Sequence, residues 1–210
     1  MANDWAHDEL GEIKEFWRKY GRVIAYGVIA AALAVGGVFY YRHYHAQQRI
    51  LAGALYEEIL SAASQGRFGL AAAAGHKLEK SYASTPYAGQ AALLLARLAY
   101  EKNDIPATIT ALKFAAHKGR QWSVRTTARL RLGSLLLALG HPHKAWGYAH
   151  IAKPYGFKAM ALGLQAEILA REGHKRQALA AYGEALKDAP KKSAATTLWR
   201  REQAQLRAAS

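Results

Sequence analysis

The chain has 210 residues, 51% apolar side chains, no cysteine and a formal net charge of +14. The absence of cysteine excludes disulfides, thiolate zinc sites, CxxC redox motifs and a cysteine nucleophile, although it does not identify a compartment. The charge is uneven, because residues 1–22 sum to −1 and the remaining residues to +15, and such a surface attracts acidic partners, anionic lipid or nucleic acid through its long-range field.

The first predicted element is a membrane-spanning helix from Val23 to Tyr41. These nineteen residues carry no charge, and at ~1.5 Å rise per residue they span close to 30 Å, the thickness of a bilayer core. Aromatic side chains flank the stretch on both sides, as they do at the two headgroup layers: Trp17, Tyr20, Phe39, Tyr40, Tyr41 and Tyr44. A buried globular helix or a cleaved signal peptide fits less well, because the apolar stretch is long and YYRHYH follows it where a cleavage site needs small residues.

The basic residues near the span predict its orientation. Four precede it within residues 1–22 and two follow it within the next twenty residues: Lys14, Arg18, Lys19 and Arg22, then Arg42 and Arg49. By the positive-inside rule, residues 1–22 stay in the cytoplasm and the large C-terminal domain is exported. In a bacterium, the chain is then a single-pass, type II inner-membrane protein with a periplasmic domain.

The rest of the chain is predicted to be helical, because Ala, Leu, Lys, Arg, Glu and Gln dominate and the five prolines are spaced like boundaries. Residues 42–85 are expected to form a long linking helix and a second helix from Phe68 to Tyr82. Residues 86–210 are expected to form a tetratricopeptide-like repeat domain, closed by a capping helix from Ala194 to Arg207. The fold class is therefore all-α, with one transmembrane helix followed by an α-solenoid.

The repeat pattern rests on three aligned alanines. Ala107, Ala145 and Ala178 are separated by 38 and then 33 residues, close to the period of ~34 residues in tetratricopeptide repeats. The unit around Ala178 fits the motif well. The unit around Ala145 has Arg129 where a large apolar residue is usual, and the unit around Ala107 is recognisable mainly by its position and its turn. Similar alanines also occur in a helical bundle without repeats.

The sequence carries no pattern that indicates an enzyme, a cofactor or a metal. The HxH pairs, His43 with His45 and His141 with His143, lack a third ligand nearby. No HExxH, GxSxG or phosphate-binding glycine loop is present, and the basic residues come without a nucleic-acid fold signature. We therefore expect a protein that neither catalyses a reaction nor binds nucleic acid.

Repeat geometry points a set of side chains from the first helix of each pair into a concave face. The candidate partner-binding residues are Tyr100, Thr127, Ser134, Glu167 and Arg171. They predict a scaffold that holds a partner segment in a shaped groove. The alternative is an envelope assembly protein that binds anionic lipid or cell-wall polymer through its basic surface, and binding of that kind weakens steeply with salt.

The chain resembles YfgM-like proteins, which are ancillary subunits of the SecYEG translocon. The stretches that carry the resemblance are IKEFWRKYGRVIAYGVI from Ile13, STPYAGQAALLLARLAYEKNDIPATITAL, LRLGSLLLALGHPHKA and LGLQAEILAREGHKRQALAAYGEAL. The resemblance implies a periplasmic domain near the translocon that works with the membrane-tethered, PpiD-like chaperone on newly exported polypeptides, and it brings no catalytic residues. The exported domain is strongly basic here, whereas that of familiar members tends to be acidic or neutral.

Overall fold

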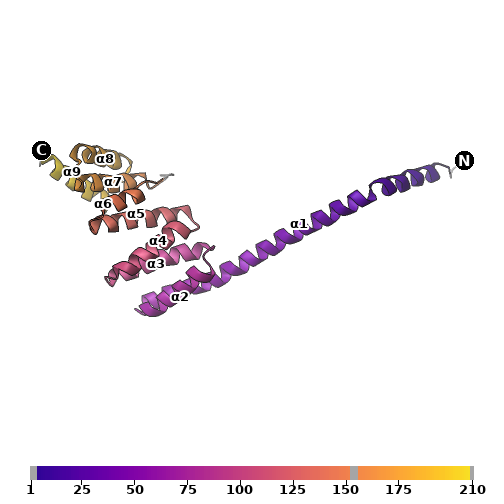
Figure 1. Ribbon diagram of the computed structural model, residues 1–210, viewed down its shortest axis with the longest axis horizontal. Helices are drawn as coiled ribbons and strands as arrows, with labels where there is room; N and C mark the ends of the chain where they lie inside the picture. Colours follow the sequence, from indigo (N-terminus) through magenta and orange to yellow (C-terminus); the bar gives the residue numbers. More distant parts are fainter. Residues whose placement is uncertain (1–3, 152–155, 209–210) are drawn as a thin grey trace. The chain divides into compact units, whose positions relative to one another are not determined.

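The computed structural model describes residues 4–151 and 156–208, with side chains described from residue 17 onward. Regular structure in these ranges is α-helical, with no strand, so the prediction of an all-α fold is confirmed. The helices are α1 (Asp4–Ser64), α2 (Phe68–Ser81), α3 (Pro86–Glu101), α4 (Ile105–Lys118), α5 (Trp122–Ala138), α6 (Pro142–Ala149), α7 (Lys158–Arg171), α8 (Lys175–Asp188) and α9 (Ala194–Ala208) (Figure 1).

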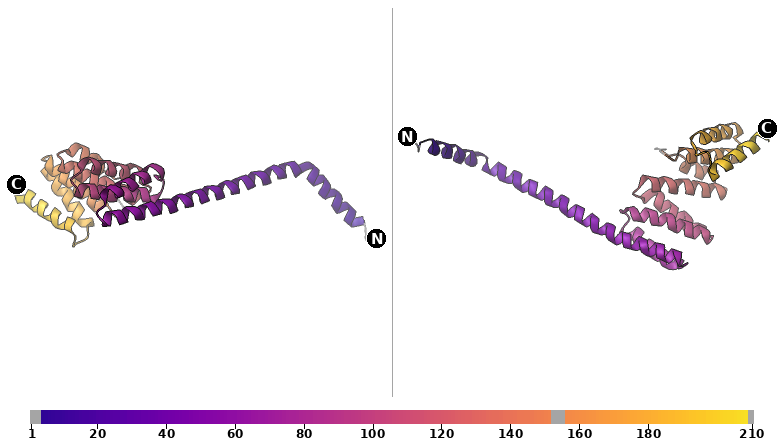
Figure 2. Two further views of the ribbon diagram at one scale, coloured as in Figure 1. Left: turned by 90° about the horizontal axis from the view of Figure 1, so that it is seen from below. Right: turned by 180° about the vertical axis from the view of Figure 1, so that it is seen from behind.

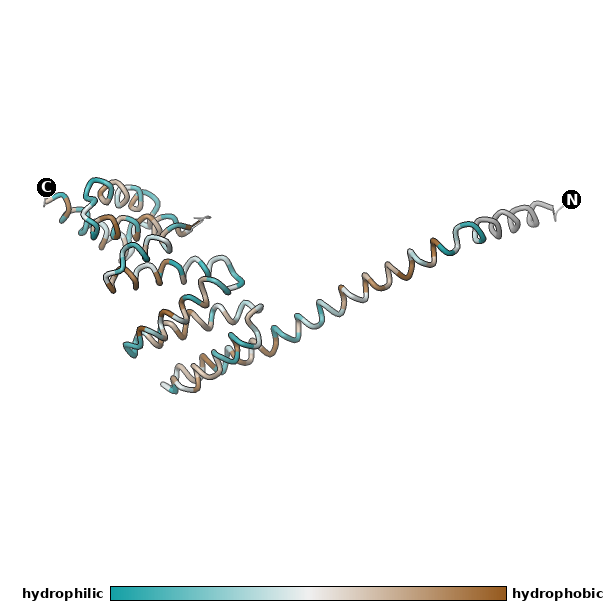
Figure 3. Tube along the Cα trace, viewed as in Figure 1, coloured by the Kyte–Doolittle hydropathy of each residue, from teal (hydrophilic) through white to brown (hydrophobic). Residues whose placement is uncertain are grey.

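The apolar stretch from Val23 to Tyr41 lies wholly within α1. All of its side chains are exposed, including Leu33 at 72% and Phe39 at 75%, and apolar residues recur along it (Figure 3). Such a surface is unfavourable in water and favourable in a bilayer. Within the described residues, α1 is the one helix long and apolar enough to cross a membrane, and it forms the transmembrane anchor of this fold.

The residues from Arg49 onward form a separate compact unit, the repeat stack. Consecutive helices in it run antiparallel and pack as neighbours, α3 with α4, α5 with α6 and α7 with α8 (Figure 2). The end of α1 packs on α2 in the same manner, with Leu55 and Ile59 buried against Ala71 and Leu78. The stack thus consists of helix pairs that bury clusters of apolar side chains between them, as in an α-solenoid.

The turn inside each pair contains one residue in the left-handed region of backbone space. These residues are Gly66 (φ 69°), Asn103 (φ 59°), Gly140 (φ 78°) and Gly173 (φ 81°). Glycine adopts this conformation without strain, and asparagine tolerates it better than most residues. The recurrence shows that the pair formed by the end of α1 and α2 has the same turn geometry as the three pairs that follow.

A small buried residue stands five positions after each of these turn residues. It is Ala71, Thr108, Ala145 and Ala178, each at most 3% exposed, and it lets the second helix approach the first. The sequence alignment on Ala107 was therefore wrong by one position: Ala107 is exposed, and Thr108 takes the buried place. The Thr108 hydroxyl donates to the Asp104 carbonyl at 2.7 Å, which satisfies its polar group in the core.

Arg129 replaces the large apolar residue expected at its position in α5, and the structure explains how it fits. Its guanidinium donates to the carbonyls of Gly147 and His150 at 2.9 and 3.1 Å, and its Cζ lies 5.9 Å from the centre of the Tyr148 ring. A cation is favourable at the carboxyl end of a helix, where carbonyls lack intrahelical partners. Arg129 thus links α5 to the end of α6.

Candidate partner-binding groove

The repeat stack contains a groove of about 770 Å³. Most of its lining comes from the first helices of successive pairs, α3, α5 and α7, and the rest from α4, α9 and Phe157. We call it the groove, and its lining residues are Ala96, Arg97, Tyr100, Thr108, Leu112, Thr127, Leu130, Arg131, Ser134, Leu135, Ala138, Phe157, Met160, Leu164, Glu167, Ala195, Leu198 and Trp199.

Helical periodicity places the α5 and α7 residues in the groove. Thr127, Leu130, Ser134 and Ala138 recur at intervals of three or four residues along α5, and Met160, Leu164 and Glu167 do so along α7. Side chains at these intervals share one face of a helix. Since both helices turn this face the same way, two parallel stripes of side chains line the groove.

Four of the five predicted residues line the groove: Tyr100, Thr127, Ser134 and Glu167. Arg171 does not. It continues the stripe of α7 one turn beyond Glu167, but it is the last residue of that helix and is exposed at its end. The structure therefore brings four of the five together.

The groove has an apolar floor and an exposed apolar rim. Leu112, Leu130 and Leu164 are at most 4% exposed at its base. Tyr100 (58% exposed) and Met160 (52% exposed) lie at its rim. A bound partner would cover the apolar surface of both side chains. Covering apolar surface yields ~25 cal/mol per Å². The free energy of binding would therefore come mainly from covering the exposed side chains at the rim.

The charged groups of the groove differ in how they are neutralised. Arg97 pairs with Glu101, Nε to Oε1 at 2.8 Å. Arg131 is exposed, and no ion pair to it occurs in the described part of the chain. Burial raises the pKa of the Glu167 carboxyl; a hydrogen bond with the Trp199 side chain and the charge of Arg171 lower it in part, while Glu202 raises it further. The groove thus combines an exposed cation without an ion-pair partner among the described residues, Arg131, with a half-buried carboxyl whose pKa is raised, Glu167.

From its sequence, α9 is expected only to cap the stack, but the helix also contributes to the groove. Ala195, Leu198 and Trp199 form one wall. Trp199 is 5% exposed, and a Cβ at Gly163 would lie 2.7 Å from its Nε1 and closer still to its ring. The available signal was the Leu-Trp pair in an otherwise polar helix, since an isolated tryptophan among charges needs an apolar partner surface.

The histidine pairs show no metal-site geometry. No group of three or more potential metal ligands occurs among the described residues. His143 lies 3.5 Å from the Glu172 carboxylate, Nδ1 to Oε1, and is 96% exposed. This is a surface contact between the turns of neighbouring repeats.

The sequence matches the family model of a tetratricopeptide repeat-like domain over residues 14–206. The chain belongs to this family. It is 26% identical over 170 residues to the ancillary SecYEG translocon subunit of Haemophilus influenzae, covering 80% of this chain and 81% of the relative. It is 24% identical over 176 residues to the ancillary SecYEG translocon subunit of Escherichia coli K12, covering 84% of each. The predicted resemblance to YfgM-like proteins is confirmed, and so is the predicted tetratricopeptide-like solenoid behind an N-terminal anchor.

Proposed function

We propose that this tetratricopeptide repeat-like protein is a non-enzymatic ancillary subunit of the SecYEG translocon in the bacterial inner membrane. Its N-terminus lies in the cytoplasm and its repeat stack in the periplasm. There the groove binds a polypeptide segment, from a PpiD-like chaperone or from a newly exported chain. The observation that carries the proposal is the groove itself. Its apolar rim and floor suit the binding of a polypeptide segment.

The shape of the groove supports a chain segment as its ligand. It runs across α3, α5 and α7, so a bound segment would contact several repeats at once. Fully burying a Leu- or Met-sized side chain yields about 1.5–3 kcal/mol, and Tyr100, Met160 and Leu198 are the exposed residues positioned to gain from it. A handful of such anchors is enough for a specific but reversible interaction.

The charges in the groove indicate which kind of polypeptide segment it binds. Unpaired Arg131 favours an acidic side chain or a chain terminus with a carboxylate. We therefore expect a mostly apolar segment with an acidic group on one side. A purely charge-driven ligand would not need the leucines of the floor.

The predicted orientation is supported by the basic residues around the span. Lys14, Arg18, Lys19 and Arg22 precede Val23, and such residues are retained on the cytoplasmic side. The repeat stack is long enough to be exported despite its charge, because long domains largely escape this rule.

The test is to isolate the full chain from gently solubilised membranes and to quantify translocon subunits and the PpiD-like chaperone recovered with it. In a Ser134→Trp variant the groove is filled in the middle of α5, and we expect recovery of the groove-bound partner to fall at least several-fold. The matched control is Gln177→Trp, on an exposed position of α8 outside the groove. Equal recovery with both variants, at unchanged helix content, would refute the groove as the binding site.

A further inference from the structure

One edge of the repeat stack concentrates unpaired positive charge. The helices alternate in direction, so the carboxyl ends of α2, α4 and α8 lie at the same edge (Figure 1). Exposed cations gather at these ends and in the adjoining loops. We call this set the basic edge, and it consists of Lys77, Lys80, Lys118, Arg120, Lys191 and Lys192.

Two of the three acidic residues near the basic edge pair with lysines outside this set, so most of its charge is not cancelled. Glu79 lies 3.7 Å from His76, Asp188 pairs with Lys158 at 2.6 Å, and Glu184 pairs with Lys187 at 2.6 Å. In contrast, none of the six lysines and arginines of the basic edge has an ion-pair partner within the described ranges. The excess of positive charge extends along the chain, because no Asp or Glu occurs between Asp104 and Glu167.

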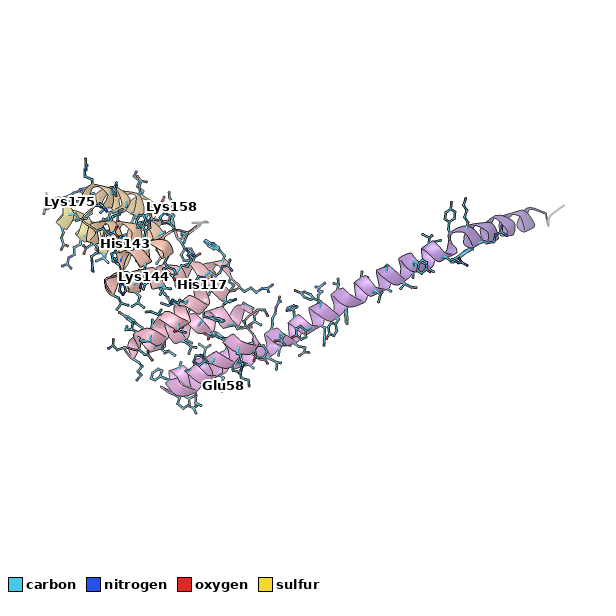
Figure 4. All side chains as sticks on the ribbon, viewed as in Figure 1. Glu58, His117, His143, Lys144, Lys158 and Lys175 are labelled. Carbon is cyan, nitrogen blue, oxygen red and sulfur yellow. The ribbon has the colours of Figure 1, made fainter. Side chains whose placement is uncertain are left out.

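The opposite edge, formed by the turns inside each helix pair, also carries exposed cations: Arg67, Lys102, Lys144, Arg171 and Arg176. Glu101, Asp104 and Glu172 lie there beside cations such as Lys175, and Lys102 covers the Phe68 ring at 4.3 Å. Figure 4 labels His117 and Lys158 at the side of the basic edge and Lys175 on the other side of the stack. Favourable placement of a cation at a helix carboxyl end explains single residues such as Lys80 and Lys118, but not the pair of lysines in the loop after α8.

The spacing of these cations favours an extended anionic surface over a compact ligand. Neighbouring helices pack ~8–10 Å apart, so the cations on α2, on α4 and after α8 spread over several tens of ångströms along the stack. Since charges in physiological salt act over ~8 Å, a small anion would meet the cations of only one of these places, such as Lys191 with Lys192. A bilayer surface with anionic headgroups would meet all of them.

The connection to the anchor makes the membrane the nearest such surface. The stack begins at Arg49, at the same end as the carboxyl end of α2, and the apolar stretch ends at Tyr41. The residues between them reach less than ~30 Å even if fully extended, so the tether holds the start of the stack close to the headgroups at high effective concentration. From these observations we infer that the basic edge of the repeat stack binds anionic phospholipid headgroups of the membrane that holds the anchor.

Binding at the basic edge has a consequence for the groove. Each lysine or arginine near an anionic bilayer strengthens association about fivefold, so a few of them suffice to orient a tethered domain. With this edge on the lipid, the opposite edge points away from the membrane, and the first helices of the pairs stand upright on it. The inference does not depend on what the groove binds.

The experiment uses the full chain reconstituted into phosphatidylcholine vesicles with or without phosphatidylglycerol. The chain has no cysteine, so single Ser→Cys substitutions carry a fluorophore at chosen places: Ser123→Cys near the basic edge and Ser64→Cys at the opposite edge, both exposed. Energy transfer to a headgroup-labelled lipid reports the approach of each edge. We expect phosphatidylglycerol to increase transfer at position 123 and not at position 64, and moderate salt to abolish the increase.

Charge-reversal variants show whether the cations of the basic edge bind the lipid or whether the tether alone keeps this edge near the bilayer. The variant Lys118→Glu, Lys191→Glu, Lys192→Glu should lose the phosphatidylglycerol response at position 123, whereas the matched variant Lys175→Glu, Arg176→Glu at the opposite edge should keep it. No response to phosphatidylglycerol, an equal response at both positions, or a response that survives the first variant would each overturn the inference. Acidic proteins as the true ligand of this edge would give the first of these results.

Discussion

The indole of Trp199 occupies the space in which a side chain at position 163 would lie. Gly163 is buried in α7, and an added Cβ would approach three atoms of the Trp199 side chain too closely, with Nε1 at 2.7 Å. Because Trp199 is the main buried apolar anchor of α9, this contact fixes the helix that forms one wall of the groove. The absence of a side chain at position 163 thus makes room for Trp199, which holds α9 at the candidate binding site.

Substitution of Gly163 by alanine should therefore displace α9. Overpacking of this kind costs about 1–3 kcal/mol, and we expect a lower thermal midpoint and greater exposure of Trp199 in its fluorescence spectrum. Gly147→Ala is the matched control, because no atom outside the neighbouring residues and backbone of α6 lies within 4 Å of the added Cβ. There, alanine should leave stability unchanged or raise it slightly. Equal effects of the two substitutions would contradict the proposed packing.

Arg129 should contribute to stability through its hydrogen bonds to the carbonyls at the end of α6. Replacing it by methionine keeps the apolar stem but removes the donors to Gly147 and His150, and we expect a loss of about 1 kcal/mol in the free energy of unfolding. Arg131→Met, at a neighbouring exposed cation that donates no hydrogen bond in the described structure, should change it much less. Chemical denaturation of the full chain in detergent measures both, and a larger loss for Arg131→Met would count against this role.

Glu167 should make the stack less stable as pH rises. Burial raises the pKa of its carboxyl above the ordinary value of 4.5, so the folded state penalises the charged form. This penalty is absent below pH 4.5 and complete above the raised pKa. Glu167→Gln should accordingly raise the thermal midpoint at pH 7, with the difference shrinking to nothing as pH falls below 4.5. A glutamine variant that is less stable at pH 7 would show that the ionised form is favoured instead.

The architecture could be predicted from the sequence because each of its signals is local. An uncharged stretch of membrane length, prolines at helix starts and alanines near the repeat period all appear in the residues themselves. The alignment failed at Ala107 because a threonine that bonds to its own helix can replace the small apolar residue, as Thr108 does. The period alone could not distinguish these adjacent positions.

The candidate site could be predicted only where it depends on the repeat. Tyr100, Thr127, Ser134 and Glu167 follow from the helix face that the first helix of a pair turns inward. The wall formed by Leu198 and Trp199 depends on how α9 folds back, and that contact is made with Gly163, more than thirty residues earlier. Likewise, the basic edge becomes visible only when the carboxyl ends of separate helices are brought to one side.

The most direct measurement is site-specific photo-crosslinking of the full chain in intact membranes from a probe at Ser134, in the middle of the groove, compared with the same probe at Gln177 on α8. The account predicts crosslinks from position 134 to translocon subunits, to the PpiD-like chaperone or to a defined exported chain, and none of these from position 177. Crosslinks of equal strength from both positions, or identified partners from position 177 alone, would contradict the central claim that the groove receives a polypeptide at the translocon.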